Sequence, residues 1–175
     1  MSDARWIDVA DDIASAAHHF KMAARLHEIG GMDGEDLEAY RNRMAFMQAM
    51  QSGYTSLEGG IERVFDILGE AKPTGADYHA VMVRRASRAV PGERPAMVGS
   101  TVAAAMDEAR RFRHVVRKNY DNFRVGEAGS AVAAARLLST DLVGDCYCSS
   151  HSLIRTATTG AKSRLLSGEL QLEAP

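Results

Sequence analysis

The fold of this 175-residue chain is decided by residues 33–68, which read DGEDLEAYRNRMAFMQAMQSGYTSLEGGIERVFDIL. Their large side chains recur at steps of three and four positions, the spacing of one face of an α-helix. That face comprises Leu37, Tyr40, Met44, Met47, Gln51, Tyr54, Ile61, Phe65 and Leu68. Asp33 is the predicted N-cap of the helix, and Asp36 falls in its first turn. The pair Gly59–Gly60 is expected to interrupt the helix and to bend or loosen it.

Helices are also predicted on both sides of this one, which favours an all-α, up-and-down bundle of about five helices. They cover residues 7–29, 77–89, 100–120 and 130–157. Two Pro- and Gly-containing loops, at residues 72–75 and 91–95, separate the middle helices, because proline cannot continue a helix. No stretch shows the clean alternation of a strand.

The apolar positions of the first and fourth of these helices predict which faces are buried. The first helix is expected to bury Ile7, Ala10, Ala14, Ala17 and Ala24, with Ile13 and Phe20 beside them. The fourth is expected to bury Val102, Ala105, Ala109, Phe112 and Val116. Gly30–Gly31 is the predicted C-cap of the first helix.

The composition is that of an ordinary soluble domain, with 46% hydrophobic and 25% charged residues. No apolar run approaches the length of a membrane span, and the N-terminus lacks the apolar region of a signal peptide. Cys146 and Cys148 are separated by one residue, which makes a disulfide between them strained. We therefore expect a cytoplasmic protein with reduced cysteines.

Positive charge is concentrated in one part of the chain, although the net charge is −2. Residues 1–39 hold nine acidic and three basic side chains, whereas residues 84–124 hold ten basic and four acidic ones. Six Arg or Lys residues lie between Arg110 and Arg124 alone, late in a predicted helix. This segment can attract an anionic polymer. The alternative is a solvated helix face without a ligand.

The predicted helix arranges this basic segment into two adjoining groups. With Phe112 and Val116 in the core, the side chains on one flank are Arg110, Arg113, Arg117 and Tyr120. His114 and Lys118 fall on the outer face. Arginine offers a planar fork for phosphate oxygens, and histidine titrates near neutrality. Such a set suits metal-independent RNA cleavage, in which a ribose 2′-hydroxyl attacks the adjacent phosphate.

The run Phe112–Tyr120, which reads FRHVVRKNY, resembles the R-x4-H-x-Y signature of HEPN ribonuclease toxins of the HepT-like type. That signature often reads F-R-H-x-x-R-H-x-Y. Three upstream segments are similar to the family's first core helix, its second-helix entry and the loop before the motif helix. They are Gly53–Arg63, Pro73–His79 and Arg94–Ala96. The similarity covers residues 45–125, and residues 1–44 and 126–175 match only as generic helices.

The resemblance implies one HEPN-like helical domain over residues 1–175, with residues 1–44 as a helical extension and residues 159–175 as a flexible tail. It implies a homodimer in which two motif helices form one composite cleft. The expected activity is that of an endoribonuclease toxin of a toxin–antitoxin or phage-defence module, with no metal or cofactor. The expected partners are RNA and a cognate minimal nucleotidyltransferase antitoxin.

The same resemblance assigns roles to residues of the basic helix. Arg113 corresponds to the motif arginine, and His114 fills the polar position after it. Tyr120 corresponds to the motif tyrosine, to which the antitoxin of some pairs attaches AMP. Arg110 and Arg117 are the expected phosphate-binding neighbours.

Lys118 departs from the signature, because it stands where the family has its catalytic histidine. An unperturbed lysine, with a pKa of about 10.4, is a poor proton shuttle at neutral pH, although it can hold a phosphate. Three interpretations follow. The chain is a weakened or inactive relative, or His114 has taken over acid–base work, or Lys118 is a deliberate change. Two non-catalytic alternatives are a module that binds RNA or a protein, and a helical dimer without RNA contact.

Other candidate sites are less specific. Cys146, Cys148 and His151 have metal-like spacing, but no second cysteine pair completes a structural zinc site, so the cysteines are interpreted as small buried hydrophobes. His79 follows Asp77 near a predicted helix start and is interpreted as a local cap or packing contact. No Gly-rich phosphate loop is present.

Overall fold

The computed structural model describes residues 4–118, 126 and 128–144. Helix α1 spans Arg5–Ile29, α2 spans Leu37–Leu68, α3 spans Tyr78–Ala86 and α4 spans Ser100–Lys118. A fifth helical segment covers residues 129–144. Over these ranges the only β pairing is the isolated bridge between Val90 and Arg94. The predicted all-α bundle of about five helices is therefore confirmed. The predicted tail and the Cys146–His151 segment lie outside the described residues.

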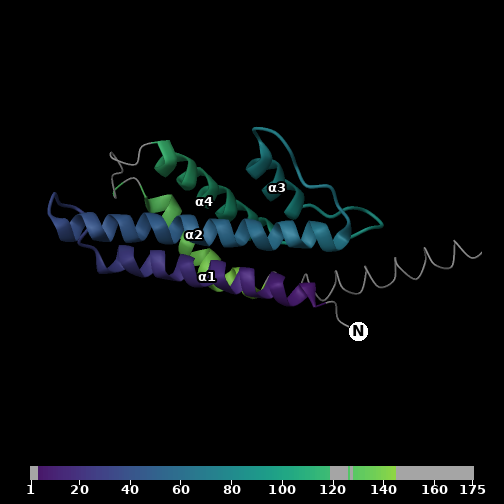
Figure 1. Cartoon of the computed structure of the whole chain (residues 1–175), viewed down its shortest axis with the longest axis horizontal. Helices are drawn as coiled ribbons and strands as arrows, with labels where there is room; N and C mark the ends of the chain where they lie inside the picture. Colours follow the sequence, from purple (N-terminus) through teal and green to yellow (C-terminus); the bar gives the residue numbers. More distant parts are fainter. Residues whose placement is uncertain (1–3, 119–125, 127, 145–175) are drawn as a thin grey trace, which may run out of the picture.

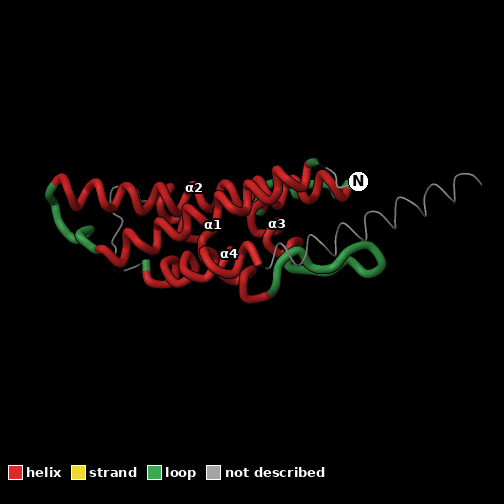
Figure 2. The backbone as a smooth tube through the Cα atoms, turned by 90° about the horizontal axis from the view of Figure 1, so that it is seen from below, coloured by secondary structure: helices red, strands yellow, loops and turns green. Residues whose placement is uncertain are grey.

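A long hairpin of α1 and α2 forms the body of the molecule, and α3 and α4 lie together on one side of it (Figure 1). The same arrangement is visible in the tube seen from below (Figure 2). Residues 129–144 contribute Val132, Leu138 and Leu142 to the common core. Their Arg136 pairs with Glu28 of α1 at 3.2 Å. In the part of the chain described, each helix is too polar or too short to cross a bilayer.

Glycines in α2 allow α1 to approach closely. A Cβ at Gly53 would lie 3.0 Å from the Phe20 ring, and one at Gly60 would lie 3.0 Å from Ile13 Cδ1. Helix α2 runs without a break through Gly59–Gly60, so the predicted interruption is wrong. The tight contact with α1 explains the difference, because buried side chains stabilise the helix where its own propensity is weak.

The two ends of the hairpin turn are fixed by caps. Gly30 adopts φ 77° and its N–H donates to the Leu26 carbonyl at 3.2 Å, which confirms it as the C-cap of α1. The N-cap of α2 is Asp36, whose Oδ1 accepts a hydrogen bond from the Ala39 N–H at 2.8 Å. The prediction of Asp33 as the cap was therefore wrong by one turn.

The buried face of α1 differs from the predicted one. Ile7 is 64% exposed, and Ala10 and Ala14 are also exposed. The other four predicted positions, Ile13, Ala17, Phe20 and Ala24, are buried, and Val9, Ala16 and Ala23 complete the face. Alanines lie on every side of α1, so the position of the bulky Ile13 and Phe20 decides which side faces α2. The predicted buried face of α4 is confirmed at all five positions.

Arg94 ties the loop before α4 to the ends of α2 and α3. It is 5% exposed and forms an ion pair with Glu70, which follows α2. Its guanidinium also donates to the carbonyls of Arg85, Arg88 and Pro95 at 2.8–3.2 Å. One side chain therefore joins three segments, and it sets the point from which α4 leaves the loop.

Replacing Arg94 with alanine is expected to lower the free energy of unfolding by about 3 kcal/mol, because Glu70 and buried carbonyls lose their partner. Urea unfolding followed by circular dichroism measures the change. Arg84→Ala on the exposed side of α3 is the control, with an expected change of less than about 0.5 kcal/mol. Equal stabilities for the two variants would contradict this role of Arg94.

Candidate functional site

Helix α4 places its basic residues at different depths. Arg110 and Arg113 are half-buried, with side chains 27% and 21% exposed, whereas His114 and Arg117 are exposed. The division follows from the helical period, because Phe112 and Val116 point into the core and draw their neighbours toward it. Lys118 is the last residue of α4. Its side chain and the whole of Tyr120 lie outside the described residues, so their predicted roles stay predictions.

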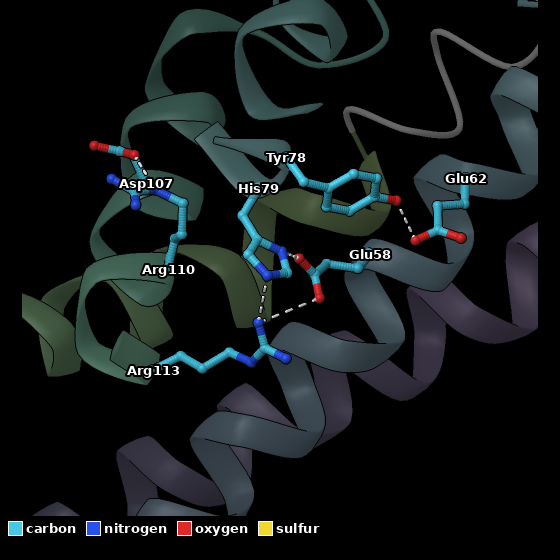
Figure 3. A network of polar contacts seen from close by, with 7 residues as sticks. All are labelled: Glu58, Glu62, Tyr78, His79, Asp107, Arg110 and Arg113. Atoms are coloured by element: carbon cyan, nitrogen blue, oxygen red, sulfur yellow. Dashed lines mark hydrogen bonds and ion pairs between the residues drawn. The ribbon is translucent and has the colours of Figure 1, made fainter. Parts of the chain in front are cut away.

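Three helices bring one polar cluster together beside Arg113 (Figure 3). We call Glu58, His79 and Arg113 the Glu–His–Arg cluster. His79 of α3 forms a hydrogen bond through Nδ1 with Oε1 of Glu58 on α2. Arg113 Nη1 on α4 lies 3.0 Å from His79 Nε2 and 3.8 Å from Glu58 Oε2. The cluster therefore contains an acid, an imidazole and a guanidinium in mutual contact.

The partners of His79 determine where its proton lies. Arginine has only donors, so His79 Nε2 accepts the hydrogen bond from Arg113. The Nδ1 atom then carries the proton and donates it to the Glu58 carboxylate. A neutral imidazole in this tautomer keeps its basic nitrogen toward Arg113.

Burial and charge make the floor of the cluster unusual. The Glu58 side chain is only 10% exposed. Burial raises the pKa of Glu58, and its contacts with His79 and Arg113 oppose that rise. Tyr54 lies below, with its hydroxyl buried and without a hydrogen-bond partner among the described residues. Burial, followed by the charge of Glu58, raises the pKa of that hydroxyl. The Arg113 guanidinium carbon lies 5.5 Å from the Tyr54 ring centroid, a cation–π distance.

Further polar contacts hold the helices around the cluster. Tyr78, next to His79, donates from its hydroxyl to Glu62 of α2. On α4, Asp107 accepts from Arg110 Nε at 2.7 Å and pairs with Arg111 at 2.7 Å. Burial acts to raise the pKa of Asp107, but the bonds and charges of the two arginines outweigh it and hold that pKa below its usual range. Part of the positive charge of Arg110 is therefore balanced within α4.

The positions of several predicted residues can be compared with the structure, whereas their catalytic and binding roles stay predictions. Arg110 and Arg113 are both half-buried on α4 (Figure 3). His114 is exposed. Of the two interpretations of His79, a local cap or a packing contact, the second agrees with the structure, because His79 packs on Tyr54 and Tyr78. It also bonds to Glu58 and Arg113, which the sequence did not indicate. Glu58 had been noted only as part of a similar segment. A signal for it existed, because it stands one turn after Tyr54 on the buried face of α2, where a charge needs a partner.

This arrangement is suited to a phosphate ester. The guanidinium of Arg113 can hold two phosphate oxygens. His79 Nε2 lies within hydrogen-bond distance of that guanidinium, so a bound phosphate would lie near an imidazole. Arg110 and Arg117 add positive charge along the helix. Among the residues described, no three His, Cys, Asp or Glu side chains group as metal ligands.

An all-α bundle with this arginine-bearing helix matches a known family. The family model described as "HepT-like protein" matches residues 45–146, which is more than half of the chain. The chain therefore belongs to the HepT-like family. The match extends past the predicted limit at residue 125 and includes residues 129–144, so that segment is more than a generic helix. No curated protein and no solved structure matches the chain.

Proposed function

We propose that this protein is a toxin of a toxin–antitoxin or phage-defence module, that it acts in the cytoplasm, and that it cleaves RNA without a metal ion. The observation that carries the proposal is the setting of Arg113, 3.0 Å from the acceptor nitrogen of His79 and partly open to solvent. A fork-shaped cation beside an imidazole suits a reaction in which a phosphodiester gains negative charge and a neighbouring hydroxyl loses its proton. Membership of the HepT-like family supports the same conclusion.

In the proposed reaction, the ribose 2′-oxygen attacks the neighbouring phosphorus and the bond to the 5′-oxygen breaks. The products are a 2′,3′-cyclic phosphate and a 5′-hydroxyl. Arg113 stabilises the negative charge that develops on the phosphorane oxygens. Arg110 and Arg117 bind the flanking phosphates, and Lys118 holds a phosphate as a point charge.

We further propose a homodimer, in which the α4 helices of two copies form one cleft. Exposure of Val115 at 45%, next to the exposed His114, supports this contact, because an apolar side chain on a helix face is stabilised by a partner. The proposed antitoxin is a cognate minimal nucleotidyltransferase that attaches AMP to Tyr120. A bulky anion on Tyr120 would repel the RNA phosphates that the arginines of α4 bind.

Lys118 favours a second candidate function, an RNA-binding module without cleavage. The same arginines would hold RNA in either case, so binding alone does not separate the two functions. Detection of the cleavage products does.

The test is the incubation of an end-labelled RNA with the protein in EDTA, beside the same RNA carrying one 2′-deoxynucleotide at the cleaved position. We expect cleavage of the all-ribose strand only, with a 2′,3′-cyclic phosphate end, because the nucleophile is the 2′-hydroxyl. Cleavage of both strands would contradict the proposed reaction. Salt-dependent binding without cleavage would leave the RNA-binding module as the function.

A further inference from the structure

We propose that His79, held by Glu58, is the general base of this site and takes the proton of the attacking 2′-hydroxyl from its place on α3. This inference rests on the proposed function, because it assigns a residue to that reaction. It places the base on a different helix from the sequence motif.

The first argument is distance. His79 Nε2 lies 3.0 Å from Arg113 Nη1, so a phosphate bound by this guanidinium would lie next to the imidazole. The attacking 2′-hydroxyl is attached to the ribose carbon beside the one that bears this phosphate. It therefore enters the region that Nε2 faces. A general base must come within about 2.6–3.2 Å of the oxygen whose proton it takes, a range that this setting permits.

The second argument is orientation. Glu58 comes from the middle of α2, is almost fully buried and accepts the Nδ1 proton of His79. This bond fixes the tautomer that leaves Nε2 basic, and the carboxylate stabilises the imidazolium that forms after proton transfer. The His79 side chain is 36% exposed, so part of the imidazole is open to solvent. Enzymes commonly activate a nucleophile with a base that a third group, here the buried acid Glu58, holds in position.

The step balances in atoms and charge. The 2′-hydroxyl proton moves to His79 Nε2 while the bond from the 2′-oxygen to phosphorus forms. The bond from phosphorus to the 5′-oxygen breaks with its electron pair on that oxygen, which takes a proton from water. The imidazolium then returns its proton to the solvent, so there is no net change in protons. Arg113 transfers its hydrogen bonds from His79 to the phosphate as the substrate binds.

The charged and titratable groups that face His79 come from three helices. Glu58 and Tyr54 face it from α2, Arg113 faces it from α4, and Tyr78 precedes it on α3. Glu58 brings a negative charge to the imidazole and Arg113 a positive one. Because a base must be unprotonated to act, cleavage is expected to rise with pH, as it does for a histidine base in general.

The experiment measures single-turnover cleavage against pH for the full chain and for His79→Gln. We expect this substitution to slow cleavage about 100-fold or more and to remove the rise with pH, with RNA affinity changed less than about threefold. His79→Ala should regain part of its rate in added imidazole, an effect that a structural histidine does not give. His18→Gln, on an exposed position of α1, is the matched control with unchanged rate and pH profile.

The outcomes separate this inference from the proposed function. If the natural chain cuts RNA and His79→Gln keeps both its rate and its pH profile, the inference is overturned and the function stands. Loss of the rise with pH in His114→Gln instead would assign the base to α4 and also overturn it. Failure of the natural chain to cut any RNA would overturn both proposals. Circular dichroism of each variant confirms folding, and the imidazole rescue of His79→Ala supports the inference even where His79→Gln is poorly folded.

Discussion

Arg113→Ala is expected to reduce RNA cleavage by about 100- to 1,000-fold, the usual effect of removing one preorganised donor to a developing charge. Among the motif residues that the structure describes, Arg113 is the one in contact with both Glu58 and His79. Its loss would remove the fork that holds the phosphate and the charge that stabilises the phosphorane. Single-turnover cleavage in EDTA measures the effect.

Two further variants give this expectation its controls. Arg111→Ala removes the same charge from the same helix, but Arg111 is 60% exposed and paired with Asp107 and Glu108. We expect a change in rate of less than about threefold for it, as for a screened surface charge. Arg113→Lys keeps the charge without the fork and should fall between the two. Equal losses for Arg111→Ala and Arg113→Ala would show that only net positive charge matters.

Lys118→His is expected to raise cleavage by about 100-fold, because it restores a group that exchanges protons near neutral pH at the position of the family's motif histidine. The new imidazole would protonate the departing 5′-oxygen, which otherwise takes its proton from water. The rate in single turnover and the growth of cells that express the variant both measure the gain.

Lys118→Gln is the matched control for this gain, since it removes the lysine charge without adding an acid. If the gain comes from proton transfer, Lys118→Gln should not cut faster than the natural chain. Equal gains in rate for the histidine and glutamine variants would mean that the charge of Lys118, and not the lack of a proton donor, limits the reaction.

The buried face of a helix was predictable where a few large apolar side chains stand among charged ones. In α4, Phe112 and Val116 stand among charged neighbours, so its buried face follows directly from the sequence. In α1 the alanines are spread around the helix, and alanine fits equally well in the core or at the surface. Leu37 and Tyr40 belong to the periodic face of α2 that the sequence indicates, but they are 64% and 52% exposed beside the hairpin turn. Among the helices that the structure describes, none covers that turn of α2 (Figure 1).

The site was predictable only in the part that lies on one helix. Arg113 follows from the motif, because neighbours along a helix are fixed by its period. The contact of His79 with Glu58 joins residues 21 positions apart, and its contact with Arg113 joins residues 34 positions apart. A helical period shows which face a residue occupies, but it does not reveal which residue of another helix it meets.

The two close contacts that α1 makes with glycines of α2 limit which substitutions the two helices accept. Phe20 contacts Gly53 and Ile13 contacts Gly60, so in each contact a large side chain packs against a residue that has no side chain. The two contacts are seven residues apart on both helices, running in opposite directions. A larger residue at either glycine fits only if the residue of α1 that it contacts is replaced by a smaller one. Among related chains, the two residues of each pair should therefore change in size together. Such covariation would tie α1 to the region that the family model matches, residues 45–146, although α1 lies outside it.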